Sequence, residues 1–303
     1  MSKLDKYKGI IPAFYACYDD EGNVCPERTQ KLAQHYLKVG VKGLYVGGSS
    51  GECIYQNVEE RKLILENVMK AVGGKMTIIA HIAAPSTRDS VELARHAESL
   101  GVDALAAIPP IYFRLPEASI EAYWSSMIDA TDLDFIIYNI PQTTGYSLSV
   151  DLYKKMLEKP QVIGVKNSSM PVLDILTFKQ AATKEVVIFN GPDEQFVAGR
   201  LMGADGGIGG TYGVMPELFL AADAALKANN FDLAQRIQFA ITEIIFTMVQ
   251  AQGNLYDVMK SILKREGLEV GSVRGPLACV TSADEAVIEK AHALIKAARA
   301  EFC

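Results

Sequence analysis

Short runs of apolar residues recur along the chain, and each is followed by an amphipathic stretch of helix length. There are eight such runs, and they begin between 20 and 34 residues apart. That spacing is the length of one strand-helix unit, and unbroken apolarity is typical of strands buried on both faces. The runs span 9–16, 43–46, 76–82, 104–108, 134–140, 162–165, 186–190 and 206–208. Eight units fit a closed barrel better than an open sheet, so the pattern predicts a (β/α)8 barrel.

Residues that favour helix ends lie between these runs. Two segments resemble N-terminal capping boxes, three prolines stand at first-turn positions, and two glycines follow helical stretches. The capping-box segments are 57–60 and 86–89. The prolines are Pro26, Pro116 and Pro216, and the glycines are Gly40 and Gly101. These signals support a helix after each strand.

The chain beyond the eighth run contains no further strand pattern. Four helical stretches follow, at 218–228, 231–252, 255–266 and 282–301. One of them can close the barrel, which leaves about three as a C-terminal helical extension. No linker rich in Pro, Gly or Ser separates the two parts. We expect the barrel at 1–225 and the extension, packed on it, at 226–303.

Composition and charge exclude several classes of protein. The 303 residues are 49% hydrophobic and 22% charged, which are ordinary globular proportions. Thirty Lys and Arg against 36 Asp and Glu give a net charge of −6. Because no basic block is present, a nucleic-acid partner is not expected.

The cysteines and the lengths of the apolar runs indicate in which cellular compartment the protein is expected. No run approaches the roughly 18 apolar residues of a membrane span, and the charged start lacks the apolar stretch of a signal peptide. The five cysteines are widely spaced and include no Cys-x-x-Cys pair. A disulfide framework or zinc knuckle is therefore not expected. These features predict a cytoplasmic protein without a membrane contact.

Lys166 is the most informative polar residue, because active groups of such barrels lie where the strands end. It directly ends the apolar run 162–165. A lysine there would be partly desolvated, with a lowered pKa, and an unprotonated amine can attack a ketone to form a Schiff base. The alternative is a lysine that reaches solvent or pairs with a carboxylate.

Two neighbouring features would complement such an amine. Tyr138 ends the preceding run, where its phenol can move protons or simply pack. Ser49 and Ser50 lie in a glycine-rich turn after the second run, where backbone N–H groups can converge on an anion such as a carboxylate. A tight turn without a ligand is the alternative for this loop.

The same loop also matches the Gly-x-Ser-x-Gly pattern of serine hydrolases at Ser49. That interpretation requires a helix directly after the serine, and a later Asp and His. Here the helix is expected only near Asn57, while His81 lies in a strand and both His96 and His292 lie in helical stretches. The hydrolase therefore stays a distant alternative.

Asp193 and Glu194 place two carboxylates just beyond the seventh run. They can accept hydrogen bonds from a polyol, or merely complement a helix N-terminus. The glycines at 206–210 do not complete the Gly-x-Gly-x-x-Gly pattern of dinucleotide sites, and the histidines show no metal-ligand spacing. Neither a metal nor a dinucleotide is expected.

Taken together, these stretches resemble the N-acetylneuraminate lyase and dihydrodipicolinate synthase family of class I pyruvate aldolases. The resemblance runs from about Tyr7 to the last helix. It is carried by Gly-Gly-Ser-Ser-Gly-Glu at 47–52, Tyr-Asn-Ile-Pro at 138–141, Gly-Val-Lys at 164–166 and Gly-Ala-Asp-Gly-Gly-Ile-Gly at 203–209.

The resemblance implies a role for each catalytic position. Lys166 would form a Schiff base with pyruvate and need no other cofactor, and Tyr138 would act as acid and base. Ser49 and Ser50 would hold the pyruvate carboxylate and relay protons. Tyr112 would reach that relay from a neighbouring subunit, since the family is homotetrameric.

Further residues favour the lyase branch of the family. The synthases place an arginine two residues after the proline of their Tyr-Asn-x-Pro motif, and Thr143 stands there instead. The lyases bind the glycerol hydroxyls of the sugar with an Asp-Glu pair, which Asp193 and Glu194 match. The other sugar-site positions that this resemblance implies are Ser168, Gly191, Tyr256, Thr143 and Gly210, of which the last two differ from the residues usual in lyases.

The activity so implied is reversible cleavage of N-acetylneuraminate (sialic acid) to pyruvate and N-acetylmannosamine. Two alternatives within the family are a 2-keto-3-deoxy sugar acid aldolase and a dihydrodipicolinate synthase. A non-catalytic barrel that binds keto acids is a third.

Overall fold

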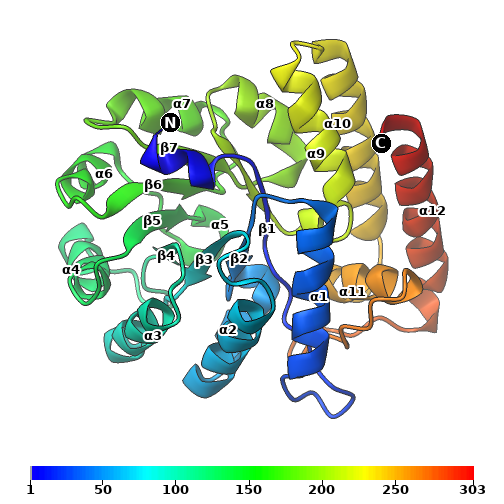
Figure 1. Cartoon of the computed structure of the whole chain (residues 1–303), viewed down its shortest axis with the longest axis horizontal. Coiled ribbons are helices and arrows are strands. Elements are labelled where there is room, and N and C mark those ends of the chain that lie inside the picture. Colours follow the sequence, from blue (N-terminus) through cyan, green and yellow to red (C-terminus); the bar gives the residue numbers. More distant parts are fainter. Residues whose placement is uncertain (1) are drawn as a thin grey trace.

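The computed structural model describes residues 2–303, and within them eight parallel strands form a barrel with the helices outside (Figure 1). The strands are β1 Ile10–Pro12, β2 Gly43–Val46, β3 Thr77–His81, β4 Ala104–Ala107, β5 Asp134–Asn139, β6 Val162–Asn167, β7 Val187–Asn190 and β8 Gly206–Gly209. They pair in the order β1-β8-β7-β6-β5-β4-β3-β2. A parallel bridge between Ala13 and Tyr45 joins the two ends of this sheet. The predicted (β/α)8 barrel is confirmed.

The helices follow the strands as the apolar pattern predicts. They are α1 Pro26–Val39, α2 Val58–Val72, α3 Thr87–Ser99, α4 Glu117–Ile128, α5 Pro141–Thr144, α6 Val150–Leu157, α7 Leu173–Ala181, α8 Phe196–Leu201, α9 Pro216–Lys227, α10 Phe231–Met248, α11 Leu255–Arg265 and α12 Glu285–Phe302. Asn57 and Glu60 form a complete capping box at the start of α2, with hydrogen bonds of 2.9 and 3.0 Å. At α3 only half of the box forms, because Ser86 accepts from the Asp89 N–H and nothing returns.

Some predicted boundaries differ from the observed ones. β1 is only three residues long, where the run 9–16 suggested a longer strand. β6 continues past the run 162–165 and includes Lys166 itself. Pro116 precedes the first residue of α4 instead of occupying its first turn. α9 ends at Lys227, so the expected boundary after residue 225 falls in its last turn and stays a prediction.

The pairing of β5 with β6 contains an irregularity. Phe135 pairs with Val162, but Ile136 pairs with Gly164, which leaves Ile163 without a partner. Such a bulge adds one residue to one strand and shifts the pairs that follow it. Beyond it, Tyr138 pairs with Lys166.

Apolar side chains fill the barrel and the space between strands and helices. Ile11, Tyr45, Ile136 and Phe189 belong to the inner cluster. The N-terminal end of the barrel is covered by the turn Lys3–Tyr7, whose Tyr7 hydroxyl lies 2.6 Å from the Asp103 carbonyl oxygen. The opposite end, where the strands terminate, is the one left for a site.

The last three helices lie together on one side of the barrel, next to α9 (Figure 1). Arg299 of α12 ties them to it, because its guanidinium contacts Glu217 at 3.0 Å and the Val214 carbonyl at 2.9 Å. Among the described residues, no helix combines the length and the apolarity that crossing a bilayer requires.

Candidate active site

Lys166 and Tyr138 lie side by side at the open end of the barrel. They are register partners on β6 and β5, and the Lys166 Nζ lies 3.7 Å from the centre of the Tyr138 ring. Its other neighbour is Tyr45 of β2, whose ring centre is 4.4 Å from the same nitrogen. The amine is therefore held between two phenol rings.

The surroundings of Lys166 change its protonation. Only 4% of the residue is exposed. Burial lowers the pKa of Lys166 to about 7, and the charge of Asp193 partly opposes this shift. Because an amine with that pKa is about half unprotonated at neutral pH, a large share of the molecules can attack a carbonyl carbon.

A cavity of about 330 Å³ opens over this amine, and we call it the lysine cavity. Every site residue predicted from the sequence lines it except Tyr112 and Thr143. The predicted residues that do so are Ser49, Ser50, Tyr138, Lys166, Ser168, Gly191, Asp193, Glu194, Gly210 and Tyr256. Residues from β5, β6, the loops after β2, β7 and β8, and helix α11 thus converge on one volume.

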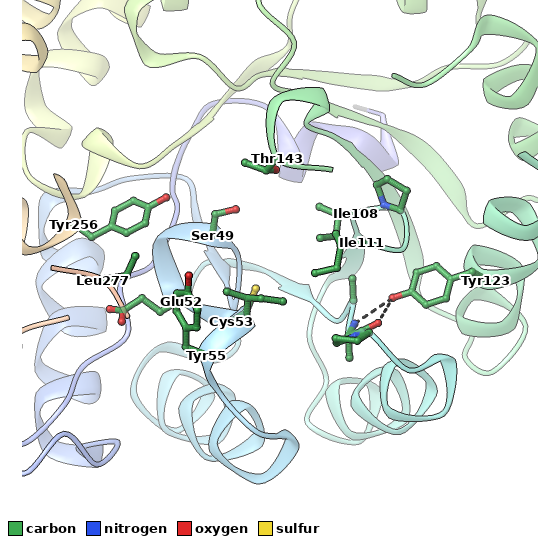
Figure 2. Close-up of a pocket in the computed structure, with 15 residues that line it drawn as sticks. Ser49, Glu52, Cys53, Tyr55, Ile108, Ile111, Tyr123, Thr143, Tyr256 and Leu277 are labelled. Carbon is green, nitrogen blue, oxygen red and sulfur yellow. Dashed lines mark hydrogen bonds between the residues drawn. The ribbon is translucent and has the colours of Figure 1, made fainter. Parts of the chain in front are cut away.

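A second cavity, also of about 330 Å³, adjoins the first and shares Ser49 and Tyr256 with it. We call it the apolar cavity, since Ile108, Ile111 and Leu277 are among its lining residues (Figure 2). It does not include Lys166.

The two exceptions have clear positions. Thr143, on the short helix α5, lines the apolar cavity (Figure 2). Its hydroxyl donates to the Ile140 carbonyl at 3.3 Å. Tyr112 is 92% exposed and adopts a left-handed backbone with φ of 79°. Its ring packs edge-on against Phe113, and it does not reach the lysine cavity of its own chain.

Tyr138 is buried beside the amine, and its hydroxyl is close to two serines. Burial raises the pKa of Tyr138 to about 12, and the Ser49 and Ser168 hydroxyls offset part of that rise. The phenol is therefore protonated in the resting site and can donate its proton to a reacting group.

His81 of β3 holds the glycine-rich loop by a hydrogen bond to its backbone. The His81 Nδ1 lies 2.8 Å from the Gly47 carbonyl oxygen, and its Nε2 lies 3.4 Å from the Ile108 N–H. Burial lowers the pKa of His81 to about 3, so the ring is neutral, with Nδ1 donating and Nε2 accepting. Both ring nitrogens are thus occupied.

This arrangement argues against the hydrolase alternative for Ser49. The serine begins a short 3₁₀ turn, Ser49–Gly51, and the next α-helix begins only at Val58. A hydrolase needs a histidine that accepts the serine proton. His81 is committed to Gly47 and Ile108 instead.

In the part of the chain that the structure describes, the turn also leaves backbone donors without partners in residues that line the lysine cavity. Its backbone bonds run from the N–H groups of Gly51, Glu52 and Cys53. Within residues 2–303, the N–H groups of Ser49 and Ser50 have no backbone acceptor. Together with the serine hydroxyls, they form a concave set of donors of the kind that binds a carboxylate.

Asp193 is oriented at the far side of the cavity by Thr211. The N–H and the hydroxyl of Thr211 both donate to Asp193 Oδ2, each at 2.7 Å. Oδ1 is buried and has no partner among the described residues. Burial raises the pKa of Asp193 to about 7, and the Thr211 bonds lessen that rise. Thr211 therefore fixes one oxygen of this side chain and leaves the other, which faces Gly209, without a partner in the described chain.

Sequence reasoning missed Tyr45 and Thr211. The alternation of inward and outward positions along 43–46 would have placed Tyr45 on the inner face. No comparable signal marks Thr211, whose role depends on the position of Asp193. Among residues 2–303, no three His, Cys, Asp or Glu side chains gather as a metal site would require.

Comparison with known proteins establishes the family. Residues 6–298 match the Dihydrodipicolinate synthetase family. The chain belongs to this family. The match runs from before β1 into α12, so the whole lysine cavity lies inside the family domain.

Relatives within the family are similar over their full length. A curated N-acetylneuraminate lyase of Mediterraneibacter gnavus is 58% identical over 100% of this chain and 96% of its own length. The wild-type sialic acid aldolase of Ruminococcus gnavus, a solved structure, is 58% identical, with a TM-score of 0.97 over 98% of this chain and 100% of the other. A catalytic lysine mutant of that aldolase gives a TM-score of 0.99 at 57% identity over 100% of both chains.

Proposed function

We propose that this chain is a class I aldolase that reversibly cleaves N-acetylneuraminate to pyruvate and N-acetylmannosamine. The observation that carries the proposal is the buried amine of Lys166, with its pKa lowered to about 7, beside the Tyr138 phenol in the lysine cavity. The names of the full-length relatives support the same reaction. The Ruminococcus gnavus aldolase has a catalytic lysine, as the name of its mutant structure states, and we assign that role to Lys166 in this chain.

The reaction begins with a covalent bond to the substrate. The neutral Lys166 amine attacks the C2 ketone of the sugar acid, and the Tyr138 phenol donates the proton with which the C2 oxygen leaves as water, so that a protonated imine and a phenolate result. The Tyr138 phenolate then takes the proton of the C4 hydroxyl as the C3–C4 bond breaks, directly or through the substrate carboxylate. The electron pair of that bond moves into the imine, which becomes an enamine, while C4 leaves as the aldehyde of the amino sugar.

The remaining steps regenerate the enzyme. The enamine takes a proton at C3, and water hydrolyses the imine to release pyruvate and the free Lys166 amine. Because the protonated imine itself accepts the electrons, neither a metal nor an organic cofactor is needed.

The two ends of the cavity bind different parts of the substrate. The free N–H groups and hydroxyls of Ser49 and Ser50 hold the carboxylate next to C2. Asp193 and Glu194 accept hydrogen bonds from the glycerol hydroxyls, and Asp193 Oδ1 has no other partner among residues 2–303. The cavity wall is completed by Ser168, Gly191, Gly210 and Tyr256.

The synthase activity is less compatible with these residues. A second carboxylate on the aldehyde substrate needs a cation, and the position that supplies an arginine in synthases is Thr143. Its hydroxyl faces Ile140 and the apolar cavity. A polyol end is therefore the better fit for this chain.

The enzyme acts as a cytoplasmic homotetramer, in which Tyr112 of one subunit completes the proton relay of its neighbour. The exposed side chains of Tyr112 and Phe113, 92% and 71% accessible, support an interface at this loop. The loop lies beside the apolar cavity, because its Ile111 lines that cavity. Aromatic side chains that exposed are typical of protein interfaces. Light scattering of the purified protein gives the subunit number directly.

A pyruvate-release assay tests the substrate. The purified chain is supplied with N-acetylneuraminate or 2-keto-3-deoxy-gluconate, and in the reverse direction with pyruvate and aspartate semialdehyde. We expect release from N-acetylneuraminate that EDTA does not reduce. Turnover of 2-keto-3-deoxy-gluconate alone would overturn the sugar assignment.

Borohydride trapping tests the mechanism. Reduction in the presence of pyruvate fixes the imine, so mass spectrometry of the digested protein is expected to show an adduct on Lys166. The Lys166→Ala variant is the control without the amine. A wild-type chain without any adduct, or a non-catalytic barrel that binds pyruvate and turns over no sugar acid, would contradict the proposal.

A further inference from the structure

The lysine cavity has two walls that come from distant parts of the chain. Ser49 and Ser50 lie in the loop after β2, whereas Tyr256 and Met259 lie on α11 of the C-terminal region. In Figure 2 the Tyr256 ring points across toward the Ser49 hydroxyl. The spacing of these walls decides which substrates fit between them.

Glu52 connects the two walls from outside the cavity. It stands directly after the turn Ser49–Gly51, and its backbone is left-handed, with φ of 56° and ψ of 29°. Glycine adopts this conformation without strain, but a glutamate does so at a cost. The side chain therefore needs contacts that offset the cost, and Figure 2 shows its carboxylate pointing toward the C-terminal segment that carries Leu277.

Those contacts are charged and fully enclosed. Glu52 Oε1 lies 2.6 Å from the Lys260 Nζ, and both side chains are completely buried. Glu52 Oε2 accepts from the Arg274 N–H at 2.9 Å. The Lys260 ammonium also donates to the Ser272 carbonyl at 2.7 Å, and it lies 4.7 Å from the centre of the Tyr18 ring.

Lys260 is one helical turn after Tyr256 on α11. Residues four apart on a helix share a face, so a tether at Lys260 holds the face that carries Tyr256. At the other end of the ion pair, Glu52 lies two residues after Ser50 in the loop that follows β2. The ion pair thus joins the carboxylate-binding turn to the aromatic wall over a separation of 208 residues.

We propose that the Glu52–Lys260 ion pair is a positioning element that sets the distance between these walls and so determines affinity for the substrate. This inference rests on the proposed aldolase activity. Neither residue touches the reacting atoms, so its effect is expected in KM far more than in kcat.

The alternative is that the pair only holds the fold together. A buried ion pair is costly to break, because removal of one partner leaves an uncompensated charge. Single substitutions would therefore lower stability under both hypotheses. Replacement of both charges removes the uncompensated charge and the tether at once, which separates the two effects.

The experiment compares Glu52→Gln, Lys260→Met and the double variant with the wild-type chain. We expect both single variants to melt at lower temperature and to show a raised KM. The double variant is expected to regain most of the melting temperature, while its KM for N-acetylneuraminate stays at least tenfold above wild type and its kcat changes less than threefold. KM does not depend on the fraction of folded protein, so it remains readable if a variant folds poorly.

A matched pair elsewhere provides the control. Arg200 of α8 contacts Asp223 of α9 at 2.9 Å, with the Asp223 side chain 6% exposed, and neither residue lines the lysine cavity. Asp223→Asn is expected to lower the melting temperature without changing KM. A double variant of Glu52 and Lys260 with wild-type KM would overturn the inference. Failure of borohydride trapping in the wild-type chain would instead overturn the proposed activity itself.

Discussion

Replacement of Lys166 by methionine is expected to abolish activity and, at the same time, to stabilise the folded chain. The folded protein prefers the neutral amine, since burial lowers the pKa from 10.5 to about 7. The unfolded chain therefore binds more protons than the folded chain between those two pH values, and stability rises with pH across that window. The buried amine lowers the free energy of unfolding by its full amount below about pH 7, and it no longer lowers it above pH 10.5.

The size of the penalty follows from the two pKa values. It amounts to about 5 kcal/mol at pH 6 and about 2 kcal/mol at pH 9. Methionine has a similar length, no charge and a sulfur that packs well against aromatic rings such as those of Tyr45 and Tyr138. Lys166→Met should thus gain several kcal/mol at pH 6, and about 3 kcal/mol less at pH 9.

Urea unfolding at pH 6 and pH 9 measures both differences, because contributions from titrating groups that do not interact with Lys166 are common to the two proteins and cancel; the Asp193→Asn background removes the one charge that acts on the amine across the cavity. Lys290, exposed on α12, supplies the control, and Lys290→Met is expected to change stability equally at both pH values. The reasoning is refuted if Lys166→Met gains the same free energy at pH 6 and pH 9, or if it loses stability at pH 6.

Three further outcomes are expected. Initial rates of borohydride trapping with pyruvate should rise about tenfold from pH 6 to pH 8 and then level off, as expected for an amine of pKa about 7; a continued rise to pH 10 would contradict this for Lys166. Tyr138→Phe should retain trapping while cleavage, followed by pyruvate release, slows by about 10²–10⁴-fold. Gly209→Ala would place a Cβ 1.7 Å from Asp193 Oδ1, so KM for the sugar acid should rise about tenfold or more with trapping unchanged; an unaltered KM would show that Asp193 does not hold the sugar.

The barrel and its principal amine are predictable from sequence because both depend on local patterns. The apolar runs mark the strands, and the position of Lys166 at the end of one run places it at the open end. The loop glycines and serines are likewise contiguous. Asp193 and Glu194 are visible as a pair of carboxylates after a strand, but only the resemblance to the family assigns them to the sugar.

What sequence could not supply are contacts between segments far apart in the chain. The orientation of Asp193 depends on Thr211, which lies 18 residues further on. Glu52 forms its buried ion pair with Lys260, and the sequence around either residue contains no signal that would predict the other as its partner. Thr143 was expected beside the substrate and lines the adjoining apolar cavity, so its contact with the sugar stays a prediction. Such relations follow from the closed barrel and not from local propensity.

The bulge in β6 determines on which side of the barrel wall the amine lies. β5 alternates regularly, with Phe135 and Ile137 in the layer under the helices and Ile136 and Tyr138 in the interior. β6 begins in the same phase, with Val162 toward the helices and Ile163 inside, but Val165 again belongs to the outer layer. The extra residue has reversed the alternation.

Without that reversal, Lys166 would share the side of Val162 and lie as an unpaired cation in the apolar layer beneath the helices. Gly164 makes the reversal possible, because a Cβ there would lie 1.8 Å from the Val187 carbonyl oxygen. The side of the barrel wall on which Lys166 lies therefore depends on two things. They are the number of residues between Val162 and the lysine, and the bulge that takes up one of them. With one residue fewer between Val162 and Lys166, a regular strand would place the lysine inside without a bulge, so the bulge is what allows β6 to carry the extra residue and still present its amine to the interior.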